Sequence, residues 1–217
     1  SGGKPTGFKL CIGHPWEWFA VVKAMQETGI TPDFIVVDGA EGGTGAAPLE
    51  FTNYVGAPLQ EGLLLVHNTL IGLNLRDQIK IGCAGKVTTA FDIVRLMALG
   101  ADWCNSARGF MFALGCIQAQ ACHTGHCPTG VTTQDPVRQR ALFVPDKAQR
   151  VANFHQNTLK ALKELVEAAA GWGFQALLTS PDCASGSERI ASVVDAMVAL
   201  AGTAQEHTVV LNVQGDQ

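Results

Sequence analysis

The sequence predicts an α/β fold built on a parallel sheet, and three observations support this fold class. Short β-rich runs alternate with helix-like stretches along most of the chain. These runs are nearly continuously apolar, which is typical of parallel strands buried on both faces. Each run ends in a loop of glycines or other small residues. Four strand–helix units follow from this pattern, whereas a closed (β/α)8 barrel needs eight.

Strands are expected over residues 8–12, 34–38, 79–81 and 102–105, and helices over 16–27, 61–73, 90–99 and 147–170. The last helix is the most clearly marked, because apolar side chains recur along it at helical spacing. Asp146 stands where an N-cap is expected, and Gly171 stands where the helix should end. The chain then divides into a main α/β portion, residues 1–170, and a strand–helix–strand tail, residues 171–217.

Composition and charge exclude several classes of function. A formal net charge of −4 carries no basic excess, so neither nucleic-acid nor anionic-membrane binding is expected. No apolar run approaches the roughly 20 residues that span a bilayer. The first residues contain no secretory apolar region, so a cytoplasmic location is expected. Seven cysteines are an odd number in a chain too large to need disulfides, which favours metal-binding or catalytic thiols.

Three loops are candidates for ligand binding, because the chemistry of parallel α/β folds lies in loops that follow the carboxyl ends of strands. They span residues 38–48, 83–89 and 105–109. The first is rich in glycine, which lets backbone amides approach a ligand closely. The other two follow adjacent strands, and amides at a helix N-terminus with Lys86 and Arg108 nearby would suit a dianion. No loop has the spacing of a P-loop or of GxGxxG, and ordinary tight turns are the alternative interpretation.

A cysteine-rich stretch, "GCIQAQACHTGHCPTGV", raises the question of a metal site. Cys116, Cys122 and Cys127 are spaced C-x5-C-x4-C, wider than the pairs of structural zinc sites or the bacterial ferredoxin run. Three thiolates would suit a three-iron cluster. A zinc site that combines Cys122 and Cys127 with His123 and His126 is an alternative. Buried free thiols that act only as small hydrophobic groups are another.

Four long motifs in order, "VDGAEGGTGAAPLEF", "IKIGCAGKVTTAFDIVRLMALGAD", "CNSARGFMFALGCIQAQACHTGHCPTGV" and "TQDP", resemble the FMN-binding domain of the glutamate synthase family. The resemblance covers about residues 1–170. It implies the second half of a (β/α)8 barrel that carries FMN and a three-iron, four-sulfur (3Fe-4S) cluster. The implied reaction is reductive formation of glutamate from 2-oxoglutarate and ammonia. The family's first four strands would precede Ser1, and the electron donor is not specified.

The resemblance also implies roles for individual residues. Lys9 matches a lysine beside the flavin, where a cation stabilises the anionic reduced ring, and it is expected to act in catalysis together with Thr44. The other expected FMN contacts are loop residues: Gly42 and Gly43 over the flavin, Gly85 and Lys86 in one phosphate loop, and Ser106, Ala107 and Arg108 in the other. The expected cluster ligands are Cys116, Cys122 and Cys127. Gln134 and Asp135 of the last motif are expected to be structural.

The tail departs from this family. "GFQALLTSPDCASGSERIASVVDAM" and "TVVLNVQGDQ" resemble an internal stretch of 3-deoxy-manno-octulosonate (Kdo) cytidylyltransferase. This resemblance implies a nucleotide and metal site formed by Ser185, Gly186, Ser187, Glu188, Arg189, Gln214 and Asp216. A cytidylyltransferase fragment is therefore one alternative function, and a catalytically inert fragment is another.

An oligomer is also expected. A four-stranded parallel sheet taken from a barrel leaves two unpaired edges, and such edges promote association. Two copies around a two-fold axis would supply eight strands. The alternatives are a missing N-terminal half of the barrel and tail strands at residues 176–179 and 208–213 that extend the sheet.

Overall fold

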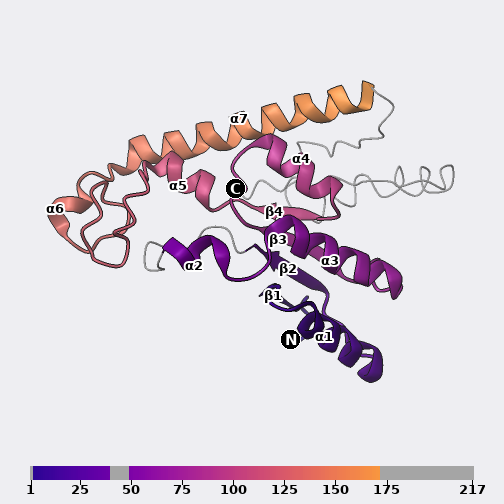
Figure 1. Ribbon diagram of the computed structural model, residues 1–217. Coiled ribbons are helices and arrows are strands. Elements are labelled where there is room, and N and C mark those ends of the chain that lie inside the picture. Colours follow the sequence, from indigo (N-terminus) through magenta and orange to yellow (C-terminus); the bar gives the residue numbers. More distant parts are fainter. Residues whose placement is uncertain (1, 40–48, 172–217) are drawn as a thin grey trace.

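The computed structural model describes residues 2–39 and 49–171 and confirms the predicted α/β fold (Figure 1). The strands are β1 (Gly7–Cys11), β2 (Phe34–Asp38), β3 (Lys80–Ala84) and β4 (Trp103–Asn105). They form one parallel sheet in the order β1-β2-β3-β4. Each strand lies beside its predecessor, as in a barrel, whereas a doubly wound sheet reverses its order part-way. The sheet is therefore the expected portion of a (β/α)8 barrel, and all but the first residue of the 171–217 tail lies outside the described residues.

The four expected helices are present, and three short helices were not predicted. The expected ones are α1 (Pro15–Thr28), α3 (Leu59–Gly72), α4 (Ala90–Ala98) and α7 (Val144–Gly171), and the additional ones are α2 (Leu49–Tyr54), α5 (Arg108–Leu114) and α6 (Pro136–Gln139). Helices of two turns or fewer carry too few periodic positions to be recognised from a sequence. The expectation that Asp146 caps the last helix is wrong, because α7 already begins at Val144 and Asp146 lies in its first turn.

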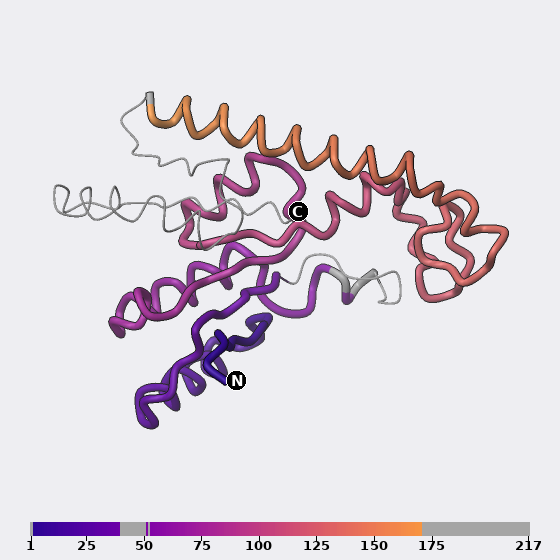
Figure 2. The backbone as a smooth tube through the Cα atoms, turned by 180° about the vertical axis from the view of Figure 1, so that it is seen from behind, coloured from indigo at the N-terminus to yellow at the C-terminus, as the bar shows by residue number. Residues whose placement is uncertain are grey.

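One apolar core lies between the sheet and the helices α1, α3 and α4. On α3, Leu63, Val66 and Leu70 are fully buried at helical spacing against the sheet. Helix α7 takes a different position, because it packs against α4 and α5 instead of the strands (Figure 1). Figure 2 shows the segment between α5 and α7 projecting from one end of the molecule. The cysteine-rich loop is therefore carried by helices and stands apart from the main core.

Burial on both faces, expected for every strand, holds for β2 and β3 but not for β1 or β4, in which no residue is buried. In β1, exposed residues alternate with half-buried ones. The reason is its place in the sheet, since no strand among the described residues pairs with its outer edge. The outer edge of β4 likewise has no strand partner in this part of the chain. The expected oligomer stays a prediction.

A polar network joins α3 to the amino-terminal ends of β3 and β4. The Arg76 side chain donates to His67 Nδ1 at 3.1 Å and to Asp102 Oδ2 at 2.9 Å. Its guanidinium also donates to the Gly100 carbonyl at 3.0 Å. The same Asp102 oxygen accepts the backbone N–H of Ile81 at 2.6 Å. One guanidinium thus satisfies groups on α3 and in the segments just before β3 and β4. The Arg76 side chain is only 17% exposed.

Replacing Arg76 with Met should lower the free energy of unfolding by roughly 2–4 kcal/mol, because it leaves a partly buried carboxylate and the carbonyls of Ile79 and Gly100 without their donor. Urea denaturation with an unchanged m-value would measure this loss. The matched control is Lys23→Met, which removes an exposed ion pair with Glu27 and should cost no more than about 1 kcal/mol. Equal losses in the two variants would contradict the importance of the network.

The stability of the fold should also fall in mild acid because of His67. Burial, with the Arg76 charge as the second cause, lowers the pKa of His67 below its ordinary 6.5, although Asp102 acts in the opposite direction. The unfolded chain therefore takes up this proton at a higher pH than the folded one, so stability declines as the pH falls below about 6.5. His67→Gln should reduce the slope of unfolding free energy against pH between 7 and 5. An unchanged slope would show that His67 does not contribute.

Candidate functional site

The carboxyl end of the sheet carries an ion pair between two strands. Lys9 of β1 lies opposite Val36 of β2, and Asp38 lies two residues further along β2. Because Ile35 and Val37 point into the helix-covered core, Val36 and Asp38 point to the other face of the sheet. There the Lys9 ammonium lies 2.6 Å from Asp38 Oδ2. Lys9 therefore lies on the face of the sheet that the helices leave open, and its role beside a flavin stays a prediction, whereas Asp38 was not predicted as a site residue.

The loop after β3 contains two unusual backbone conformations at the expected phosphate contacts. Gly85 has φ +151° and Lys86 has φ +49°, and L side chains rarely adopt either value. The Lys86 ammonium donates to Asn53 Oδ1 of α2 at 2.8 Å. This contact links the loop after β3 to the helix that follows the glycine-rich loop after β2.

The loop after β4 is tied to the loop after β3. Ser106 Oγ donates to the Val87 carbonyl at 2.7 Å. Ala107 is the N-cap of α5, and Arg108 is its first residue. Gly109 then allows α5 to approach α7, since a Cβ at this position would lie 2.7 Å from the Phe154 ring. The structure therefore brings Gly85, Lys86, Ser106, Ala107 and Arg108 to one end of the sheet.

The start of α4 differs from the expected anion site. Thr89 is its N-cap, and the Asp92 carboxylate accepts the backbone N–H groups of Thr88 at 3.2 Å and Thr89 at 2.9 Å. Burial would raise the pKa of Asp92, but the hydrogen bonds from Thr89 and Thr88 outweigh it and lower that pKa. The chain's own carboxylate thus occupies this helix start. A bound phosphate would have to use the loop backbone and the two cationic side chains instead.

Several predicted residues lie outside the described part of the chain. Gly42, Gly43 and Thr44 belong to residues 40–48, so the expected loop over the flavin is not described. The same holds for the tail residues that resemble a cytidylyltransferase site, which are Ser185, Gly186, Ser187, Glu188, Arg189, Gln214 and Asp216.

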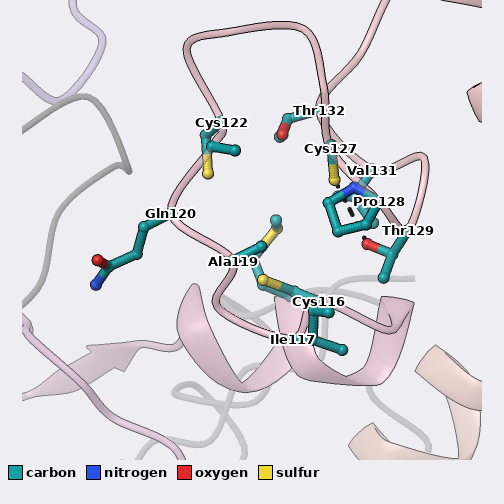
Figure 3. A pocket seen from close by; sticks show the side chains of 12 residues that line it. Cys116, Ile117, Ala119, Gln120, Cys122, Cys127, Pro128, Thr129, Val131 and Thr132 are labelled. Carbon is teal, nitrogen blue, oxygen red and sulfur yellow. Dashed lines mark hydrogen bonds between the residues drawn. The ribbon is translucent and has the colours of Figure 1, made fainter.

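The three cysteines expected to bind a cluster line one open pocket. Figure 3 shows Cys116, Cys122 and Cys127 around this pocket, on different stretches of the loop between α5 and α6. Among the described residues, however, no three His, Cys, Asp or Glu side chains are already grouped closely enough to hold a metal ion. A cluster does not need so close a group, because each cysteine binds a different iron atom.

The chemistry of this pocket fits thiolate ligands. The Thr129 hydroxyl lies 3.5 Å from Cys127 Sγ, and this hydrogen bond is the main cause that lowers the pKa of Cys127 to about 6. A thiolate, not a thiol, is the metal-binding form. Thr132 Oγ1 is buried in the same pocket, and its hydroxyl also helps to lower the pKa of Cys127. By contrast, His123 and His126 are exposed and do not line the pocket, which disfavours the zinc alternative.

The "TQDP" motif supports the cysteine loop. Thr133 is buried, and its hydroxyl donates to the Gly125 carbonyl. Asp135 caps α6 by accepting the Val137 N–H at 2.8 Å. Asp135 therefore has the structural role that was expected of it.

A second group of thiols is separate from the pocket. Cys83 and Cys104 are register partners on β3 and β4, with their sulfur atoms 3.4 Å apart. Cys83 is fully buried in the main core. Its hydrogen bond to Cys104, together with burial, raises its pKa well above the ordinary value. Cys83 is thus an inert packing residue.

A sequence model described as "Conserved region in glutamate synthase" matches residues 2–173 of this chain. The chain belongs to the glutamate synthase family. Residues 174–217 lie beyond the match.

Curated relatives are similar to this glutamate synthase family chain over its first three quarters. The "Glutamate synthase large subunit-like protein YerD" of Bacillus subtilis (strain 168) is 46% identical over 168 residues, which are 77% of this chain and 32% of the relative. The "Archaeal glutamate synthase [NADPH]" of Methanocaldococcus jannaschii is 36% identical over 166 residues, 76% of this chain and 32% of the relative. The chain thus spans about a third of the length of these relatives.

Among solved structures, a variant of flavocytochrome b2 with sulfite bound is similar at 16% identity and a TM-score of 0.42. The similarity covers 72% of this chain and 30% of that one. Within the described residues of the glutamate synthase family chain, no helix has both the length and the apolar character needed to cross a membrane.

Proposed function

We propose that this chain is part of an FMN- and iron–sulfur-dependent oxidoreductase that reductively forms glutamate from 2-oxoglutarate and ammonia. The observation that carries the proposal is the gathering of Lys9 and two mutually tied loops at the carboxyl end of one parallel sheet. Ligands of parallel α/β folds bind at this end. Family membership supports the same reaction class. The relatives' names include NADPH and ferredoxin-dependent forms, so the electron donor is left open.

The FMN phosphate would be held by the two loops that follow β3 and β4. Gly85 allows close backbone approach, and Lys86 and Arg108 supply positive charge. Ser106 holds the loops together through its bond to the Val87 carbonyl. When bound, FMN supplies the reducing electrons for the reaction. Lys9 would place a cation beside the reduced ring, and Thr44, with Gly42 and Gly43, would complete the site from the loop after β2.

The iron–sulfur cluster would be held by Cys116, Cys122 and Cys127. Their shared pocket and the lowered pKa of Cys127 support this donor set. When bound, such a cluster passes single electrons to or from the flavin. The loop that contains the three cysteines begins at the end of α5, and α5 packs against α7. Helices therefore support the proposed cluster ligands.

Replacing Gly85 with Val should weaken FMN binding by at least about tenfold, because a β-branched side chain blocks close backbone approach and disfavours φ +151°. Riboflavin, which lacks the phosphate, is the matched ligand and should lose much less affinity. Fluorescence titration of the two flavins against both proteins measures the difference. Equal losses would mean that this loop does not hold the phosphate, and a thermal melt checks that the variant is folded.

Replacing Cys122 with Ser should abolish bound iron and acid-labile sulfide while leaving most of the FMN affinity, since the flavin loops lie elsewhere. The control is Cys83→Ser, which should keep its iron because Cys83 is packed against Cys104 in the sheet and a serine hydroxyl can replace that contact. Iron and sulfide analysis of both proteins decides the assignment. Undiminished iron in Cys122→Ser would refute it.

A further inference from the structure

The ion pair between Lys9 and Asp38 has a role that the proposed function does not yet contain. Its 2.6 Å separation is that of a strong charge-assisted hydrogen bond. Lys9 is expected to act by placing its cation beside the flavin. A lysine side chain has four rotatable bonds and about 2 kcal/mol of rotamer entropy, so something has to restrict it.

Asp38 is the better anchored of the two partners. Its strand β2 is hydrogen-bonded on both sides, to β1 and to β3. The next residue, Gly39, donates its N–H to the Ala84 carbonyl at 2.8 Å and so fixes the strand end. Lys9 lies on the edge strand β1, and its side chain is 56% exposed against 32% for Asp38. The carboxylate is therefore the fixed group, and the ammonium is the group that it holds.

We propose that Asp38 is a positioning residue, which holds the Lys9 ammonium at the carboxyl end of the sheet where FMN binds. This inference rests on the proposed function, because it assumes that Lys9 lies beside the flavin. It has a testable consequence for the midpoint potential of the flavin. By its own negative charge, Asp38 disfavours the anionic reduced flavin; by holding Lys9 in place, it favours that state. The two effects move the flavin midpoint potential in opposite directions.

The midpoint potential of FMN bound to the full chain separates these effects. Lys9→Met should lower the potential, because a cation beside the reduced ring is lost. Asp38→Ala should also lower it if the main role of Asp38 is to hold Lys9. In the Lys9→Met background, Asp38→Ala should instead raise the potential, because only a negative charge is then removed. Asp38→Glu should recover part of the loss. A potential that rises with Asp38→Ala in both backgrounds would overturn the proposal.

A second measurement needs no flavin. Acetylation of Lys9 by an N-hydroxysuccinimide ester, followed by mass spectrometry, reports how firmly the ammonium is held. The initial rate should rise about two- to fivefold in Asp38→Ala, as expected for the loss of a partly exposed ion pair. Lys23 on α1, whose side chain is 74% exposed, is the internal reference. Asp33→Ala is the matched control and should leave the Lys9 rate unchanged. The Asp33 carboxylate lies just before the amino-terminal end of β2, where it accepts the Thr6 N–H.

The two measurements distinguish failure of the inference from failure of the proposed function. An unchanged Lys9 acetylation rate in Asp38→Ala overturns the inference whether or not flavin binds. An increased rate together with no change of potential in Lys9→Met supports the hold of Asp38 on Lys9 but counts against a place for Lys9 beside the flavin. Thermal melts of the variants show that the protein tested is folded.

Discussion

Hydrogen bonding between parallel strands in one register is the constraint on which the candidate site depends. It places the ends of β1, β2, β3 and β4 at the same edge, although the strands are separated by long stretches of sequence. Because side chains alternate along a strand, the same register decides which of them leave the core. Lys9 and Asp38 meet for this reason, and the loops that begin at Gly85 and Ser106 become neighbours.

The two proposed cofactor sites are supported in different ways. The loops proposed to bind flavin follow the strands directly and are tied to the sheet and to each other by backbone and side-chain hydrogen bonds. The cysteine loop is held by α5 and α7, where the Phe110 and Phe154 rings pack edge to face at 5.1 Å. Its own turns depend on Thr133 and Asp135. The cysteine loop is therefore supported by helices and by its own turns instead of by the sheet.

The two ends of the sheet have opposite physical character. At the amino-terminal end, Arg76 satisfies groups on α3 and in the segments just before β3 and β4, and it is largely buried, so this end contributes stability. At the carboxyl end, charged side chains remain partly exposed and backbone conformations are unusual at Gly85 and Lys86. This division is typical of (β/α) barrels, in which stability and chemistry lie at opposite ends of the strands.

The sequence by itself determined the fold class, the four strands and the long helices, because these depend on local apolar periodicity and on glycine-rich strand ends. It did not determine the short helices, the true start of α7 or the carboxylate of Asp92 at the start of α4, which depend on contacts between neighbouring elements. The sequence placed Cys116, Cys122 and Cys127 close together in the chain, but only the tertiary structure shows that all three line one pocket. Asp38 became a site residue only through the strand register, because no local pattern relates it to Lys9 across a separation of 29 positions.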